Sequence, residues 1–197
     1  MSGSSAGALV GGFYASGMRP KEMIAPLMAI KRSDVWDMGG VGGLLQGQLF
    51  HNVLEKTLRV KSIEECHIPL GVTAFDLVRL RTNLITKGCL ATAVRASCTF
   101  PGLFQPVIID STPHIDGGVF DDSGLMALPG IPPSNLIVNV VCGDGRLSSS
   151  KLPDKYKHAK LLTVVLRNIP MVSPFTMDTL GPMVFSLSRS VTLMALR

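Results

Sequence analysis

The segment "GSSAGALVGGF", residues 3–13, combines a G-x-S-x-G motif with a run of small residues that favours a helix. Glycines two residues before and after Ser5 are typical of a nucleophile elbow, the sharp strand-to-helix turn that exposes a reactive serine. Such a turn leaves little room for side chains, so we expect Gly3 and Gly7 to be needed there. The helix start would also aim free amide groups, including that of Ala6, at a developing oxyanion. A glycine-rich helix start without chemistry is the alternative for this segment alone.

Two features of the surrounding sequence qualify this hypothesis. A phosphate-binding loop would need a lysine and a hydroxyl residue directly after the glycines, and residues 7–14 read "GALVGGFY" instead, so that function is excluded. An elbow also needs a strand before it. Only Met1 and Ser2 precede the motif, so we expect that strand to be missing.

Strand-like and helix-like segments alternate along the rest of the chain, which is typical of a layered α/β domain. Strands are expected at residues 68–77, 79–86, 105–110, 113–118, 135–143 and 159–168. Helices are expected at residues 6–16, 19–32, 46–59, 89–99 and 181–197. Pro26 should kink or end the second helix. No internal repeat or linker divides the sequence, so we expect one domain over residues 1–197.

The composition excludes several classes of protein. With 197 residues, of which 46% are hydrophobic and 17% charged, the chain is globular rather than disordered. Its net charge of +5 comes partly from two basic runs, Arg79, Arg81 and Lys87, and then Lys151, Lys155, Lys157 and Lys160. We expect these runs to be solvated faces or, alternatively, to attract anionic membrane lipid. Nucleic acid is excluded as a partner because no aromatic residues alternate with the basic ones.

Cysteine spacing and hydropathy bear on cofactors and location. None of the four cysteines forms a C-x-x-C pair, so no zinc or redox motif is indicated and we expect no metal. No charged segment followed by an apolar run opens the chain, and no apolar stretch approaches the ~18 residues of a membrane span. We therefore expect a cytoplasmic or peripheral membrane protein.

A second candidate residue, Asp116, lies in "HIDGGVFDD", residues 114–122. The carboxylate falls at the end of a predicted strand, and Gly117 and Gly118 after it allow backbone and ligand to approach closely. An aspartate there could accept the proton of Ser5 directly. The alternative is an ordinary Asp-Gly turn.

The histidines offer a different base. Of the four, His158 could complete a triad with Ser5 and Asp116 in the chain order of α/β hydrolases. It lies in the lysine-rich segment "DKYKHAK", which we expect to be exposed. His114 shares a strand face with Asp116, and we expect a structural role for it.

Four blocks of sequence together resemble the patatin-like phospholipase family. They are "GSSAGAL" (3–9), "TAFDL" (73–77), "ASCTFPGLFQPV" (96–107) and "HIDGGVFDD" (114–122). The resemblance implies a lipid acyl hydrolase with a three-layer α/β/α fold and a Ser–Asp dyad. Ser5 would be the nucleophile that forms an acyl-enzyme, Asp116 the base, and residues 96–106 part of the wall of the acyl site. The family implies lipid as substrate, with a membrane surface as partner, and requires no metal or organic cofactor.

The chain departs from the family pattern upstream of the elbow. The family places a glycine-rich oxyanion loop and a strand there, whereas Gly39-Gly40 and Gly42-Gly43 of this chain come after Ser5. We therefore expect an N-terminally truncated member that lacks its first strand or strands and is incomplete at both ends. A catalytically inactive lipid-binding protein and a Ser-Asp-His esterase are the alternatives.

Overall fold

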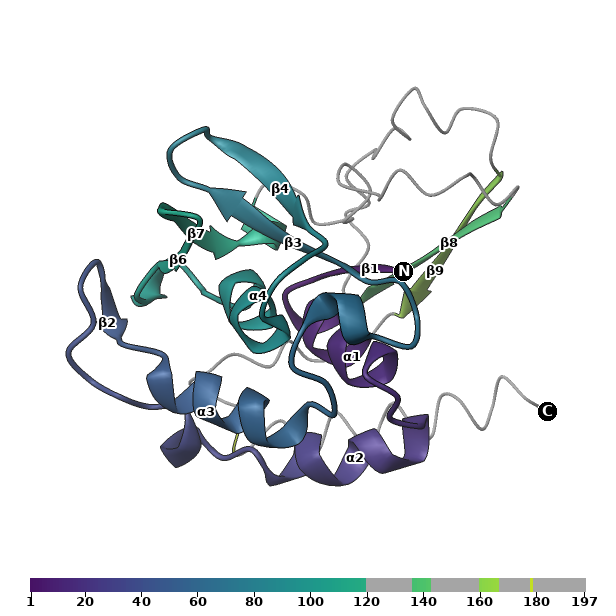
Figure 1. Cartoon of the computed structure of the whole chain (residues 1–197), viewed down its shortest axis with the longest axis horizontal. Coiled ribbons are helices and arrows are strands. Elements are labelled where there is room, and N and C mark those ends of the chain that lie inside the picture. The colour runs from purple at the N-terminus through teal and green to yellow at the C-terminus, as the bar shows by residue number, and fades with distance from the viewer. Residues whose placement is uncertain (120–135, 143–159, 167–177, 179–197) are drawn as a thin grey trace.

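The computed structural model describes residues 1–119, 136–142, 160–166 and 178 of the chain. Within them, a five-stranded sheet carries helices packed against it, and the predicted α/β class is confirmed (Figure 1). In the described part of the chain, no helix has both the length and the apolar character needed to cross a bilayer.

Strand β3 (Gly71–Asp76) is the centre of the sheet, and all six of its residues are buried. Along one edge it pairs with the antiparallel strand β4 (Arg81–Ile85). The other edge is shared: β1 (Ser2–Ser4) runs parallel to residues 71–73, and β7 (Thr112–Asp116) runs antiparallel to residues 74–76. Strand β6 (Val107–Ile109) continues the sheet beyond β7.

Four helices build the core together with this sheet. They are α1 (Ala6–Ala15), α2 (Pro20–Ala29), α3 (Gln48–Thr57) and α4 (Leu90–Ser97). Helices α1 and α4 lie next to the strands, with α2 and α3 further out (Figure 1). Between them, the side chains of Phe13, Leu54, Leu90, Val72 and Val94 are fully buried. Because α1 is made of small residues, it can approach β1 and α4 closely.

Shorter elements complete the described structure. Single turns of 3₁₀-helix span Arg32–Asp34, Ile63–Glu65 and Gly117–Val119. Strands β2 (Gly43–Leu45) and β5 (Gly102–Phe104) form a separate parallel pair. Strands β8 (Leu136–Cys142) and β9 (Lys160–Leu166) form another.

The structure corrects three expectations. A three-residue strand, β1, does precede the elbow, although the sequence predicted none. Helix α2 continues through Pro26 to Ala29, so it does not end at the proline. Strands β2 and β5 were not predicted at all, because three residues are too few to show a periodicity. The helix predicted at residues 181–197 lies outside the described residues.

Candidate active site

The topology of the sheet brings the two candidate residues together. Because β1 is parallel to β3 and β7 is antiparallel to it, the two strands run toward each other along one edge. They end at neighbouring positions of β3, Ser4 opposite Thr73 and Asp116 opposite Ala74. Ser5 follows directly, and its Oγ donates a hydrogen bond to Asp116 Oδ2 at 2.7 Å. Residues 111 positions apart are thus in direct contact.

The backbone at Ser5 has the conformation of a tight elbow. Its φ angle of 51° lies in the left-handed region, which is strained for a residue with a side chain. At Gly3, an added Cβ would collide with the carbonyl group of Gly7. At Gly7 itself, an added Cβ would meet no atom within 4 Å. The crowding predicted for both glycines is therefore found at Gly3 only.

The C-terminal turn of α4 holds the backbone of Ser5 from the other side. The Ser5 amide donates to Ser97 Oγ at 2.8 Å, and the Cys98 thiol donates to the Ser5 carbonyl at 3.2 Å. Burial raises the pKa of the Cys98 thiol, and the negative charge of Asp116 raises it further, so this thiol stays protonated. Sequence reasoning assigned residues 96–106 to the acyl site and missed these two contacts.

The carboxylate of Asp116 is buried and oriented by backbone groups. Its own amide donates to the Thr99 carbonyl at 2.9 Å, and Oδ1 accepts the Gly118 amide at 2.8 Å. This leaves Oδ2 toward Ser5. A Cβ at Gly117 would come within 2.6 Å of the Thr73 carbonyl oxygen, and one at Gly118 within 3.3 Å of Oδ1. Both glycines therefore allow the close approach that the D-G-G motif suggested.

The start of α1 carries exposed backbone amide groups beside Ser5. Ala6 and Gly7 are exposed and belong to the first turn of α1, where amide groups lack an acceptor within the helix. The Ser5 amide bonds Ser97 instead, so it is engaged elsewhere. The pairs Gly39-Gly40 and Gly42-Gly43 lie in the segment that leads into β2, which pairs with β5.

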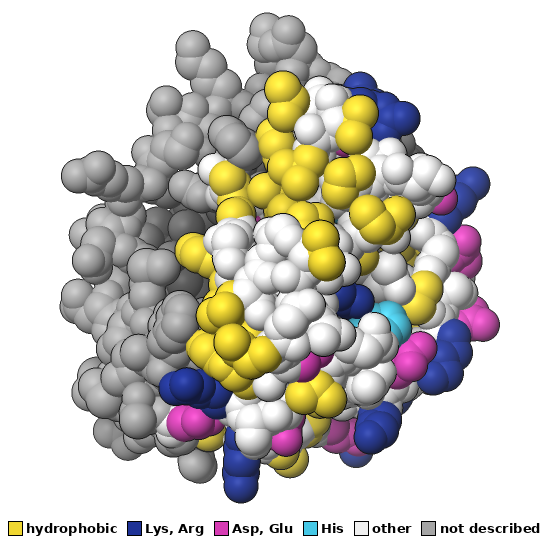
Figure 2. All heavy atoms as spheres, turned by 90° about the vertical axis from the view of Figure 1, so that its left-hand side faces the viewer, with side chains coloured by type: hydrophobic (Ala, Val, Ile, Leu, Met, Phe, Trp, Pro, Cys, Tyr) yellow, Lys and Arg dark blue, Asp and Glu magenta, His cyan; other side chains and the backbone are white. Residues whose placement is uncertain are grey.

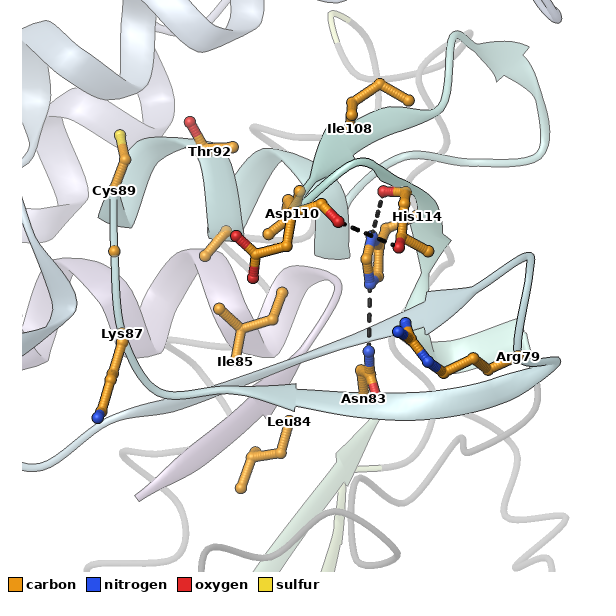
Figure 3. Close-up of a pocket in the computed structure, with 14 residues that line it drawn as sticks. Arg79, Asn83, Leu84, Ile85, Lys87, Cys89, Thr92, Ile108, Asp110 and His114 are labelled. Carbon is orange, nitrogen blue, oxygen red and sulfur yellow. Dashed lines mark hydrogen bonds between the residues drawn. The ribbon is translucent and has the colours of Figure 1, made fainter.

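Two of the described histidines, His51 and His114, have partners other than Ser5. His114 is buried, with Nδ1 2.9 Å from the Thr112 carbonyl and Nε2 3.3 Å from the Asn83 amide (Figure 3). His51 lies on α3, where its Nε2 is 3.6 Å from Glu55. His158, the base of the alternative triad, lies outside the described residues.

Two cavities of about 400 Å³ each lie away from the dyad. One is polar and lies between β4, the start of α4 and the β6–β7 turn, with Asn83, Asp110 and His114 among its walls (Figure 3). The other is apolar and lies between α1 and α2. Neither is lined by Ser5 or Asp116. Across the described ranges, no three His, Cys, Asp or Glu side chains gather as metal ligands.

Comparison with known proteins adds a family. The family model described as patatin-like phospholipase matches residues 1–129. An NTE family protein of Mycobacterium bovis and one of Mycobacterium tuberculosis are each 27% identical over 135 residues, which is 66% of this chain and 37% of theirs. Lysophospholipase NTE1 of Mycosarcoma maydis is 28% identical over 130 residues, 61% of this chain and 7% of its own length. The chain thus spans well under half the length of these relatives.

Proposed function

The chain belongs to the patatin-like phospholipase family, and on that premise we propose that it is a lipid acyl hydrolase with a Ser5–Asp116 dyad. The observation that carries this proposal is the 2.7 Å hydrogen bond from Ser5 Oγ to Asp116 Oδ2. A serine hydroxyl becomes a nucleophile when a neighbouring base accepts its proton, and the carboxylate is within reach to do so. The strained turn that presents Ser5 is the geometry such a nucleophile needs.

The chemistry follows from the positions of these groups. Ser5 Oγ attacks the carbonyl carbon of a lipid ester while Asp116 takes its proton. The oxyanion that forms lies at the start of α1, where the Ala6 and Gly7 amides and the helix dipole stabilise it. The intermediate collapses to an acyl-enzyme, and Asp116 returns the proton to the departing alcohol. Water then hydrolyses the acyl-enzyme, with Asp116 as the base for the second time.

The substrate class comes from the family and its relatives. The name of the fungal relative, Lysophospholipase NTE1, describes hydrolysis of a lysophospholipid, and we propose an acyl lipid as substrate here. Such lipids reside in membranes or other aggregates, so we propose that the chain acts at a lipid surface. The proposed steps use side chains and backbone groups alone, without a metal or organic cofactor.

Substitution of the dyad tests this function. Ser5→Ala should abolish hydrolysis of a soluble short-chain ester, and Asp116→Asn should lower kcat by about a thousandfold or more. Ser4→Ala is the matched control, because Ser4 Oγ is buried without a hydrogen bond in the described structure. If His158→Ala lowers kcat as much as Asp116→Asn does, the catalytic group is a Ser-Asp-His triad and not a dyad. Lipid binding without ester cleavage in the unmodified chain would identify the inactive lipid-binding alternative.

A further inference from the structure

The turn between β3 and β4 presents large apolar side chains to solvent. Leu77, Val78 and Leu80 are all exposed, Val78 to 67% and Leu80 to 73%. Ile108 on β6 is 61% exposed and lies across the sheet from this turn with β7 between them, since Leu77 donates its amide to the Pro113 carbonyl and Pro113 pairs with Ile108. We call these four residues, Leu77, Val78, Leu80 and Ile108, the apolar tip. Exposed apolar side chains that lie together on a surface in contact with water are typical of an interaction site.

The face that carries the apolar tip is visible in the space-filling view. The β3–β4 turn, β6 and β2 all lie toward the left-hand side of Figure 1, which faces the viewer in Figure 2. Hydrophobic side chains gather on this face, with both basic and acidic side chains at its margin (Figure 2). The β3–β4 turn and β6 thus belong to the face on which these hydrophobic side chains gather.

The backbone of Leu80 shows that this exposure has a cost. Its φ angle is 50°, in the left-handed region that glycine and asparagine tolerate and leucine does not. The side chain so placed gains little burial in return, because most of its surface remains in water. Strain that brings no packing is found where the side chain is needed for function.

Polar contacts below the apolar tip make it rigid. Asp76 has no exposed surface, and its Oδ1 accepts the amides of Val78 and Arg79, each at 2.8 Å. Its Oδ2 accepts the Arg79 guanidinium at 2.8 Å. A turn held by these bonds loses little conformational entropy when it docks.

The charges around the apolar tip favour one kind of partner. Arg79 and Arg81 flank Leu80 in the sequence and are exposed, and Lys87 follows at the end of β4. Arg79 and Arg81 are thus the cations beside the apolar tip, and Arg79 is paired with the buried Asp76. Lys87 lies beyond the other end of β4, and the exposed Asp110 lies on the β6–β7 turn. Apolar side chains with cations beside them are the pattern of segments that dock into the interface of anionic lipid.

We propose that the apolar tip docks this chain onto the anionic lipid surface that holds its substrate. This inference rests on the proposed function. The tip begins at Leu77, four residues along β3 from Thr73, which lies beside Ser4 at the elbow. At ~3.3 Å per residue, the lipid surface and Ser5 are separated by roughly 13 Å along the strand. An ester from the interfacial region of the lipid is thus presented close to the dyad.

Vesicle binding by the full chain tests the proposal. Wild type should co-sediment with vesicles of phosphatidylcholine and phosphatidylserine, more weakly without phosphatidylserine or at high salt. Val78→Asp combined with Leu80→Asp should lower the partition coefficient at least about tenfold, since each apolar side chain contributes through its burial. Leu80→Asn should also weaken binding while raising the free energy of unfolding, because it relieves the strained turn. Because vesicle binding falls while the free energy of unfolding rises, Leu80→Asn distinguishes a loss of docking from a loss of folding.

Controls decide between the outcomes. Ile24→Asp on α2 changes a side chain that is 39% exposed on another element, and it should leave vesicle binding unchanged. All of these variants should hydrolyse a soluble ester as fast as wild type. Absence of vesicle binding by wild type, an equal loss in Ile24→Asp, or a change only in oligomeric state with Leu80→Asp would overturn the proposal. If the chain binds vesicles but Ser5→Ala still hydrolyses the soluble ester, the proposed dyad is wrong while the proposed docking surface is unaffected.

Discussion

Ser5 is held by three contacts from two distant parts of the chain. Asp116 accepts its hydroxyl proton in a hydrogen bond, Ser97 accepts its amide, and Cys98 donates to its carbonyl. The motifs around Ser5 and Asp116 were sufficient to predict the pair. The contact between Ser5 and Ser97 spans 92 residues, and no local pattern could have revealed it. Which side chains contact a given residue depends on tertiary packing, so sequence reasoning named the two candidate residues and missed the side chains that hold them.

The two glycines of the elbow should respond differently to the same substitution. Gly3→Ala places a methyl group against the Gly7 carbonyl and should lower the free energy of unfolding by about 1–3 kcal/mol. Gly7→Ala meets open space in a helical turn and should raise it by about 0.5–1 kcal/mol. Urea denaturation of both variants measures the difference. If both variants lose the same free energy of unfolding, β1 and α1 are not packed as described.

Removal of the acceptor for the Ser5 amide should affect catalysis more than binding. Ser97→Ala leaves the half-buried Ser5 amide without this partner, which should cost about 0.5–1.5 kcal/mol of stability. Because the elbow then shifts, we expect kcat for a soluble ester to fall about tenfold or more while KM changes little. Cys98→Ser keeps a donor to the Ser5 carbonyl and is the matched control, with kcat near that of wild type. If only KM falls, or if neither kcat nor KM changes, Ser97 has a purely structural role.

At the scale of elements, the sheet shows what periodicity can and cannot reveal. The long apolar run that became β3 and the helices α1, α3 and α4 were predicted because each is long enough to show its pattern. The three-residue strand β1 forms along the longer strand β3, and the three-residue strands β2 and β5 pair only with each other. Their existence depends on the tertiary structure and not on their own residues. The meeting of β1 and β7, which creates the candidate site, is therefore a property of pairing order.

The turn after β3 should carry a stability that depends on pH. Burial would raise the pKa of Asp76, but hydrogen bonds from Arg79 and Val78 and the charge of Arg79 outweigh it and lower the pKa to about 2. A lowered pKa means that the stabilisation is complete above the ordinary value of 3.8 and is lost as pH falls toward 2. The difference in unfolding free energy between wild type and Asp76→Asn should therefore shrink from pH 5 to pH 2.

Chemical denaturation at several pH values measures this difference. Asp110→Asn removes an exposed carboxylate from the neighbouring turn and is the control for the loss of one charge. If the difference in unfolding free energy between wild type and Asp76→Asn stays constant from pH 5 to pH 2, the Asp76 carboxylate does not make the ionic contacts described below the turn.

Across the whole molecule, stability should be highest where the sheet meets α1 and α4. Strand β3 has partners on both edges and six buried residues, whereas β2 pairs with a single short strand. Hydrogen exchange should therefore be slowest for the amides of β3 and much faster for those of β2 and β5. Mass spectrometry of peptides from the full chain measures these rates. Faster exchange in β3 than in β2 would contradict the arrangement of the core.

The whole-molecule expectations were met to different degrees. The α/β class and the family were predicted, because hydrophobic alternation and ordered motif blocks extend over many residues. The basic run that contains Arg79 and Arg81 was expected to be a solvated face or to attract anionic lipid, but the exposed apolar residues of the apolar tip were not predicted. Its residues come from β3, β6 and the turn between β3 and β4, and only the folded chain brings them onto one surface.

Covalent labelling of the full chain tests the central claim most directly. A fluorophosphonate reacts with a serine whose proton a neighbouring base can accept, and fragmentation of the labelled peptide identifies the modified residue. We predict one adduct, on Ser5, that is lost in Ser5→Ala and forms far more slowly in Asp116→Asn. An adduct on another serine, or labelling as fast in Asp116→Asn as in wild type, would contradict the account.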